Sequence, residues 1–338
     1  IVDNENALVL YPTGGGKSLT YQVPALCLPV TYVTSLTLLQ GLTVVISPLI
    51  ALMKDQVDAL VDRGVKAANL DSTLGAERAA WVKQGVVSRR LKLLYVAPGR
   101  LNNEGFITMM SRVKISLLAI DESHCISQWG ASFRPEYLKI VHFAEEMDVE
   151  RVLCLTATAT PNVAEDICQS FFIDTQKGVF RTPVYRSNLA LQVQVANTLD
   201  QKLDTLIPFS KSRTGPAIIY VTLQKHTEEV AGHLRPHGMK PMVYYHAGLN
   251  GDERARVQQQ FMESDNGIVC ATIAFGMGID KGESFVQFKF RSQCLDWSRQ
   301  SDSLPSLTYS LDSRDINKPR HCRDCSCDYT SHAMASQH

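Results

Sequence analysis

The fold of this chain is decided by the stretch Tyr11-Pro12-Thr13-Gly14-Gly15-Gly16-Lys17-Ser18. It follows a short apolar run at residues 7–10 and precedes residues that can continue as a helix. An apolar strand, a glycine-rich turn, Gly-Lys-Ser and a helix, in that order, are typical of a phosphate-binding loop. Glycines without a Cβ atom let successive backbone N–H groups point at a phosphate, and the following helix adds its positive N-terminal end.

The side chains of this loop have distinct predicted roles. Lys17 is expected to reach the β- and γ-phosphates of a nucleotide, and the Ser18 hydroxyl is expected to bind Mg²⁺. The full G-x-x-x-x-G-K-[ST] motif is not met, because Tyr11 stands where the first glycine belongs. The alternative is a solvated glycine-rich turn with a chance Lys-Ser pair. We predict a nucleotide site, formed by Thr13, Gly14, Gly15, Gly16, Lys17 and Ser18.

Composition is that of an ordinary globular protein with two domains. The chain has 338 residues, of which 45% are hydrophobic, enough for buried cores. The formal net charge is zero, so composition gives no signal for nucleic acid and any basic surface has to be local. Nine cysteines without a signal peptide favour reduced thiols in an intracellular protein over a disulfide framework.

Residues 18 to 53 contain no Asp, Glu, Lys or Arg, which raises the question of a membrane span. Pro24, Pro29, Gly41 and Pro48 interrupt this stretch, whereas a spanning helix needs about 20 mainly apolar residues. We therefore expect a soluble protein without a membrane partner. The Thr-rich middle, residues 30–40, shows neither a helical nor a strand period, so a buried loop and a poorly packed inserted segment both remain open.

Short apolar runs alternate with helical stretches along the first half of the chain. Nearly continuous apolar runs are expected for parallel strands that are covered on both faces. The alternation predicts a doubly wound α/β sheet, whose ligands bind at the carboxyl ends of the strands. The expected strands are 7–10, 43–47, 92–96, 117–120 and 152–156, and the expected helices include 49–63 and 161–171.

An acidic pair follows one of these strands directly. The apolar residues 118–120 are succeeded by Asp121-Glu122-Ser123-His124. In a chain with a phosphate loop, Asp121 can hold the Mg²⁺ that bridges the phosphates, and Glu122 can orient and deprotonate the attacking water. His124 is grouped with them as a catalytic residue. The alternative is two acids on a solvated loop.

Two other strand ends have hydroxyl groups. The run Thr156-Ala157-Thr158-Ala159-Thr160 could link the acidic loop to a moving partner, and a helix N-cap ahead of Pro161 is an equally good interpretation. After the expected strand 43–47, Ser47 and Pro48 precede a helix. A hydroxyl and a helix N-terminus could bind a nucleic-acid phosphate there.

An aromatic segment comes immediately after the acidic loop. Gln128-Trp129-Gly130 and Phe133-Arg134-Pro135 combine bulky rings, an arginine and turn residues, a poor composition for a core segment. They suit an exposed platform on which unpaired bases stack. The alternative is a tryptophan buried under a loop.

A second α/β set follows an irregular stretch at residues 174–190. Its strands are expected at 217–221, 241–246 and 267–272, and its helices at 228–234 and 252–263. We predict a first lobe at 1–175, an incomplete second lobe at 185–290 and a low-order tail at 291–338. The second lobe's candidate residues are His246, Gly248 and Thr272 for nucleic acid, and Gly278 and Asp280 for the nucleotide and its ribose, although single glycines are more often turns.

At this point the chain resembles the RecQ family of superfamily 2 DNA helicases, over roughly residues 5 to 282. The Asp-Glu-x-His loop followed by the Gln-Trp-Gly and Phe-Arg-Pro elements is the most specific part of the match. The resemblance implies two RecA-like lobes and an ATP- and Mg²⁺-dependent 3′→5′ translocase that unwinds DNA in repair and recombination. Its partners would be single-stranded DNA and duplex junctions, and its location the nucleus if the organism is eukaryotic. The matching segments are 12–22, 45–57, 94–101, 119–137, 155–160, 217–221, 244–249 and 271–281.

The chain departs from the family pattern at three places. The upstream element with its adenine-reading Gln is not found before the phosphate loop, which we interpret as truncation. Gly99 stands where the family usually has Glu, which is expected to weaken a first-lobe contact. After Gly282 no Gln-x-x-Gly-Arg-x-Gly-Arg segment, with its arginine finger, follows. A catalytically impaired module that binds ATP and single-stranded DNA therefore stays open, whereas an RNA helicase would give no reason for the aromatic segment.

The sequence after residue 282 has little periodicity. It and residues 30–40 could be out-of-frame sequence joined to a helicase body. The tail contains a Cys-x-x-Cys pair, Cys322 and Cys325, with Cys327 and two histidines nearby. Only one such pair is present, so free thiols are favoured over a zinc site.

Overall fold

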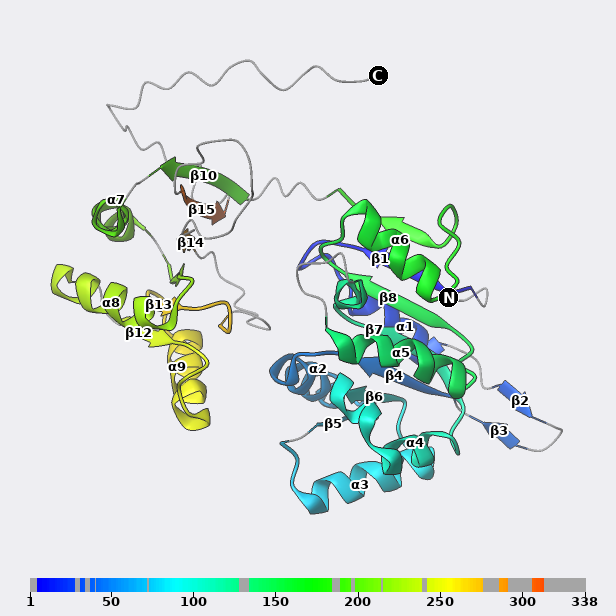
Figure 1. Ribbon diagram of the computed structural model, residues 1–338. Helices are drawn as coiled ribbons and strands as arrows, with labels where there is room; N and C mark the ends of the chain where they lie inside the picture. The colour runs from blue at the N-terminus through cyan, green and yellow to red at the C-terminus, as the bar shows by residue number, and fades with distance from the viewer. Residues whose placement is uncertain are drawn as a thin grey trace, which may run out of the picture. The chain divides into compact units, whose positions relative to one another are not determined.

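The computed structural model describes residues 5–27, 31–33, 37–39, 41–71, 73–127, 134–183, 189–195, 198–213, 215–238, 242–275, 286–290 and 306–312. They form two compact units, divided after Tyr185. Each unit is built around its own sheet with helices packed against it (Figure 1). The predicted α/β class with parallel sheets is confirmed, whereas the predicted domain limits stay a prediction.

The first unit contains a seven-stranded sheet in the order β5-β6-β4-β7-β8-β1-β9, and every neighbouring pair is parallel. The central strands are buried along their whole length, which explains why their sequences are apolar without alternation. The strands are β1 (Ala7–Leu10), β4 (Leu42–Ile46), β5 (Ala67–Leu70), β6 (Leu93–Val96), β7 (Ile115–Ile120), β8 (Val152–Thr156) and β9 (Val179–Arg181).

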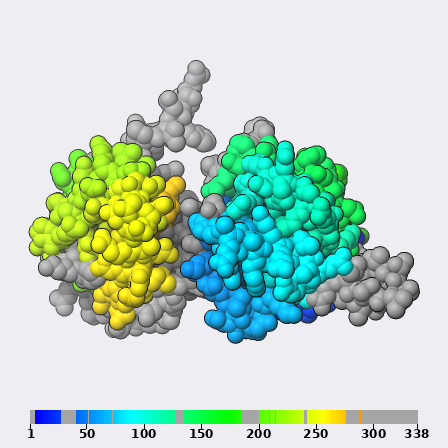
Figure 2. All heavy atoms as spheres, turned by 90° about the horizontal axis from the view of Figure 1, so that it is seen from below, coloured from blue at the N-terminus to red at the C-terminus, as the bar shows by residue number. Residues whose placement is uncertain are grey.

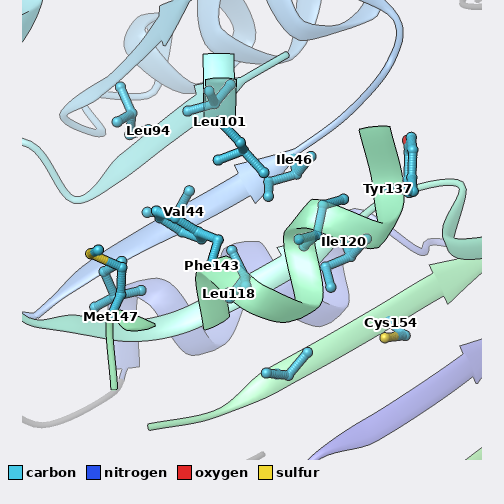
Figure 3. Close-up of a cluster of buried hydrophobic side chains, with 14 of the residues drawn as sticks. Val44, Ile46, Leu94, Leu101, Leu118, Ile120, Tyr137, Phe143, Met147 and Cys154 are labelled. Carbon is cyan, nitrogen blue, oxygen red and sulfur yellow. The ribbon is translucent and has the colours of Figure 1, made fainter. Parts of the chain in front are cut away.

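Helices cover both faces of this sheet, because successive strand side chains point to opposite sides. Val44 and Ile46 of β4 belong to one buried cluster, which Figure 3 shows, and Val45 between them belongs to the other. The first cluster is covered by α3 (Ala76–Val87), α4 (Glu104–Met110), α5 (Pro135–Glu146) and α6 (Pro161–Ser170). The second is covered by α1 (Leu19–Cys27) and α2 (Ile50–Asp62).

The sheet order determines where the candidate residues meet. The phosphate loop follows β1 and the acidic loop follows β7, and β8 lies between these two strands. All three are parallel, so their carboxyl ends lie at the same edge of the sheet. Two short 3₁₀ helices, Pro98–Asn102 after β6 and Ser123–Ile126 after β7, lie at this edge as well.

A small hairpin interrupts the charge-free stretch. Within residues 30–40, β2 (Thr31–Val33) pairs antiparallel with β3 (Thr37–Leu39). These strands differ from both interpretations of the segment, a buried loop and a poorly packed insertion. Each strand has only three residues, which is too short for a period to be visible in the sequence.

The second unit contains a six-stranded sheet in the order β10-β15-β14-β11-β13-β12. The pairs among β14, β11, β13 and β12 are parallel, and β15 is antiparallel to both neighbours. Its strands are β10 (Leu189–Val195), β11 (Ala217–Tyr220), β12 (Met242–Tyr245), β13 (Ile268–Ala271), β14 (Val286–Phe290) and β15 (Ser306–Asp312). Its helices are α7 (Leu199–Ser212), α8 (Gln224–Leu234), a 3₁₀ turn at Arg235–His237, and α9 (Gly251–Glu263), which lies on the unit's surface (Figure 2).

Strand β15 lies inside the stretch predicted to be a low-order tail, and the structure differs from the expectation there. Leu307, Tyr309 and Leu311 alternate with polar residues, which is the period-2 signal of a strand. This signal covers only seven residues, and the polar composition of the sequence around it predicts a tail of low order. The remainder of the predicted tail lies outside the described residues.

Candidate active site

The phosphate loop connects β1 to α1, and its backbone conformation requires glycine at three successive positions. Gly14 and Gly16 have φ angles of +78° and +79°, in the left-handed region that favours glycine. Gly15 donates from its backbone N–H to the carbonyl of Pro12 at 2.9 Å. A Cβ atom on Gly15 would lie 2.9 Å from that same oxygen. The three-glycine turn is therefore required by the backbone, and Thr13 through Gly16 are exposed to solvent.

Lys17 is half-buried and folds back over the loop. Its Nζ atom donates to the carbonyl oxygens of Tyr11 and Pro12, at 3.2 and 3.3 Å. Burial lowers the pKa of Lys17, and the charges of Glu122 and Asp121 oppose that effect. Lys17 therefore interacts electrostatically with both acids, although more than a hundred residues separate the lysine from them in the chain. Two neutral carbonyls are weak partners that an anionic phosphate can replace.

Asp121 is held at the end of β7 by its neighbours in the sheet. Its N–H donates to the carbonyl of Ile46 at 2.8 Å, and its carboxylate accepts from the Ser47 hydroxyl at 3.3 Å and from the N–H of Glu122 at 3.0 Å. Burial, and next the charge of Glu122, raise the pKa of Asp121 from 3.8 to about 6. A desolvated carboxylate of this kind gains from a divalent cation, and with the Ser18 hydroxyl it supplies the oxygen ligands that Mg²⁺ prefers.

Glu122 adopts an unusual backbone conformation, with φ 51° and ψ 40°. Its Oε2 atom lies 3.2 Å from Nδ1 of His124, and the same ring nitrogen lies 2.8 Å from the Thr156 hydroxyl. Hydrogen bonds to Cys125 and then to Glu122 raise the pKa of His124 to about 9, so the imidazole is charged at neutral pH. The structure thus brings together the three predicted catalytic residues other than the lysine.

The threonine run contacts the acidic loop at one end and caps a helix at the other. Thr156 is buried and contacts His124, and the Ser123 hydroxyl donates to the neighbouring carbonyl of Leu155 at 3.1 Å. At the other end of the run, Thr160 caps α6 by accepting from the N–H of Val163. Strand β8 is therefore linked to the acidic loop.

The first-unit residues predicted to contact nucleic acid are only partly described. Ser47 is buried, with 3% of its surface exposed, and its hydroxyl is bonded to Asp121 rather than displayed toward a phosphate. Pro48 is half-buried, and the side chain of Arg134 is exposed. Gln128, Trp129 and Phe133 lie outside the described residues.

The second-unit candidates meet at the ends of β12 and β13. His246 and Thr272 are each 8% exposed, and Thr272 donates from its N–H to the carbonyl of Tyr245 at 3.1 Å. The N–H of Gly248 donates to Nδ1 of His246 at 3.1 Å, which leaves Nε2 protonated and 3.6 Å from Glu228. Gly278, Asp280 and the cysteines of the tail lie outside the described residues.

Tyr137 was missed by the reasoning from sequence. It is fully buried in α5, and its hydroxyl donates to the carbonyl oxygen of Asp121 at 3.1 Å. Tyr137 ends one of the segments that resemble the helicase family, but nothing in the sequence shows which atom its hydroxyl reaches. Among the described residues, no helix is both long and apolar enough to cross a membrane.

Comparison with known proteins identifies both units. Residues 1–167 match the family model described as DEAD/DEAH box helicase, and residues 198–291 match the one described as Helicase conserved C-terminal domain. The chain resembles solved structures of Mycobacterium smegmatis helicase Lhr bound to ssDNA and AMP-PNP and of the DUF1998 helicase MrfA bound to DNA and AMPPNP. The TM-scores are 0.55 and 0.59 at 15% and 17% identity, covering 83% and 82% of this chain and 39% and 41% of the other. These likenesses show the fold alone, that of two RecA-like helicase domains.

Sequence relatives give the family. The chain is 38% identical over 290 residues to the ATP-dependent DNA helicase RecQ of Bacillus subtilis, covering 86% of this chain and 46% of the relative. It is 36% identical over 283 residues to the probable ATP-dependent DNA helicase RecS of the same organism, covering 83% and 54%. It is also 36% identical to ATP-dependent DNA helicase Q5 of Mus musculus, covering 82% and 29%. The chain spans about half the length of the two bacterial relatives. It belongs to the RecQ family of superfamily 2 helicases.

Proposed function

We propose that this protein is an ATP-dependent DNA helicase that moves 3′→5′ along one strand and unwinds duplex junctions during DNA repair and recombination. The observation that carries the proposal is that the phosphate loop after β1 and the acids Asp121 and Glu122 after β7 lie at the same edge of one parallel sheet. A lysine for phosphate, an acid for metal and an acid for water are the parts that nucleoside triphosphate hydrolysis needs. In a eukaryote the protein would act in the nucleus.

The residues of the first unit divide the chemistry among them. Thr13 through Gly16 would surround the phosphates with backbone N–H groups, and Lys17 would exchange its two carbonyl partners for phosphate oxygens. Ser18 and Asp121 would hold Mg²⁺, which would neutralise negative charge on the phosphate oxygens. Glu122 would orient the attacking water and accept its proton, and His124 would keep that carboxylate in place.

Each unit contains residues that are candidates for binding the DNA strand. In the first, the candidates are Gln128, Trp129, Phe133, Arg134, Ser47 and Pro48. In the second, the protonated Nε2 of the nearly buried His246 is a donor that a backbone phosphate can accept from, and Gly248 and Thr272 flank it. Gly278 and Asp280 would contact the nucleotide.

Steady-state ATPase assays with and without single-stranded DNA test the proposal. We expect DNA to stimulate hydrolysis and Glu122→Gln to abolish it while ATP binding survives. Duplexes with a 3′ or a 5′ single-stranded tail then test direction, and only the 3′-tailed duplex should be unwound. Stimulation that persists in Glu122→Gln would contradict the assigned role of that residue, and preferential unwinding of the 5′-tailed duplex would contradict the direction.

A second candidate function is a module that binds ATP and single-stranded DNA but hydrolyses ATP very slowly. The absence of the Gln-x-x-Gly-Arg segment from residues 283–338 favours it. An arginine finger contributes roughly 10³–10⁵ in rate, so its loss would leave binding intact and turnover low. Tight binding of both ligands without DNA-stimulated hydrolysis would select this function over the first.

A further inference from the structure

A closed ring of hydrogen bonds connects the acidic pair to the start of helix α5. The carbonyl of Glu122 accepts from the N–H of Cys125 at 2.9 Å, and the carbonyl of Cys125 accepts from the N–H of Arg134 at 2.9 Å. The carbonyl of Arg134 accepts from the N–H of Tyr137 at 2.9 Å. The Tyr137 hydroxyl closes the ring by donating to the carbonyl of Asp121 at 3.1 Å.

The closing bond is the only side-chain member of this ring, and it reaches the peptide that joins the two acids. That peptide leads into Glu122, whose left-handed conformation is unfavourable for a residue with a Cβ atom. Such a conformation persists only where the surroundings hold it. The Tyr137 hydroxyl holds the carbonyl that precedes it, on the side opposite to the Asp121 carboxylate that accepts the Glu122 N–H.

The hydroxyl of Tyr137 is suited to this role because of its burial. The ring is 0% exposed and packs in the cluster that contains Ile120, the last residue of β7 (Figure 3). Burial also raises the pKa of Tyr137, so the phenol stays protonated and remains a donor across the working pH range. A buried hydroxyl that loses its acceptor finds no water to replace it, so the bond resists breaking.

We propose that Tyr137 is a positioning residue that transmits DNA contact at Arg134 to the Asp121–Glu122 peptide. The exposed side chain of Arg134 is a predicted DNA contact, while its backbone belongs to the hydrogen-bonded ring. A shift of Arg134 reaches Tyr137 within one helical turn and reaches the acidic pair through one hydroxyl. The inference rests on the proposed function, because it assigns a route for the DNA dependence of that same site.

Binding of a fluorescent ATP analogue, with and without oligo-dT, tests the role without requiring turnover. In the unmodified protein, oligo-dT should change the affinity for the analogue by a measurable factor. Tyr137→Phe keeps the ring but removes the hydroxyl, so this factor should fall to a value close to one. The affinity for each ligand alone should stay within about twofold, since Tyr137 is not expected to touch either. Where the unmodified protein hydrolyses ATP, the DNA-stimulated kcat should fall while the DNA-free kcat is kept.

Tyr95→Phe is the matched control. Tyr95 is also buried, at 1% exposed, but its hydroxyl bonds to Tyr21 and Gln22 rather than to the acidic loop. Tyr95→Phe should lose as much stability as Tyr137→Phe, but oligo-dT should still change its affinity for the analogue by the same factor as in the unmodified protein. The inference would be overturned if Tyr137→Phe kept the full effect of oligo-dT on affinity for the analogue. It would also be overturned if both variants lost that effect equally. No effect of oligo-dT on the unmodified protein would instead overturn the proposed function, and the inference with it.

Discussion

Nδ1 of His124 lies 3.2 Å from Oε2 of Glu122, so the acid predicted to activate water is paired with a charged imidazole. The same nitrogen lies 2.8 Å from the Thr156 hydroxyl on β8. The histidine therefore joins the acidic loop to the next strand.

Replacing His124 by Ala should lower turnover by about tenfold or more, because Glu122 would lose the partner that orients it. Affinity for ATP should change little, since the phosphate loop is untouched. Steady-state kinetics would show the loss in kcat rather than in KM. His142→Ala, at an exposed position of α5, is the matched control and should behave like the unmodified protein. An unchanged kcat in His124→Ala would contradict the role.

Gly15→Ala should weaken ATP binding by about tenfold or more. The added methyl would lie 2.9 Å from the carbonyl of Pro12, which is backbone and cannot rotate away, so the loop has to change shape. Titration with a fluorescent ATP analogue measures the effect. Gly64→Ala is the control: its φ is +78° and its Cβ would meet nothing within 4 Å. That variant should lose about 1 kcal/mol of stability and bind ATP normally. Equal ATP affinity in both variants would show that the clash is relieved.

Asp121→Asn should stabilise the metal-free protein at neutral pH. The fold raises the pKa of Asp121 from 3.8 to about 6, so its ionised form costs free energy of folding. Well below pH 3.8 the aspartic acid is protonated in both the folded and unfolded states, and the two proteins should be equally stable. The advantage of the variant should grow between pH 4 and 6 and stay constant above, at on the order of 1–3 kcal/mol. Urea unfolding in EDTA across this range measures it. A variant less stable than the unmodified protein at pH 8 would contradict the burial argument.

Asn6→Ala should destabilise the first unit by about 1–3 kcal/mol. The Asn6 side chain donates to the carbonyl of Phe171 at 2.8 Å and accepts from the N–H of Val152 at 2.8 Å, so it joins β1 to β8 and the end of α6. Thermal unfolding measures the loss. Glu5→Ala, at the exposed neighbour, should have little effect. Because Asn6 lies at the amino end of β1, ATP affinity of the folded variant should be normal, and equal stability of the two variants would disprove the bridging role.

Local patterns were sufficient for the α/β class, and they predict the phosphate loop and the acidic loop. Apolar runs of four to six residues report strands buried on both faces, and the resemblance to the helicase family follows from short contiguous segments. The same local view failed for the hairpin at β2 and β3 and for β15, since their signals are brief and lie in atypical surroundings. Nor does a local pattern show that the Ser47 hydroxyl is bonded to Asp121.

The sequence by itself determined that Lys17 belongs to a phosphate loop and that Asp121 and Glu122 follow a buried strand, because these properties depend on residues that are neighbours in the chain. Only the tertiary structure decided that β8 separates the two strands, that His124 meets Thr156, and that the Tyr137 hydroxyl reaches the carbonyl of Asp121. These contacts join residues 16 to more than 100 positions apart. They depend on strand order and helix packing, which bring distant side chains within hydrogen-bonding distance and which no local pattern encodes.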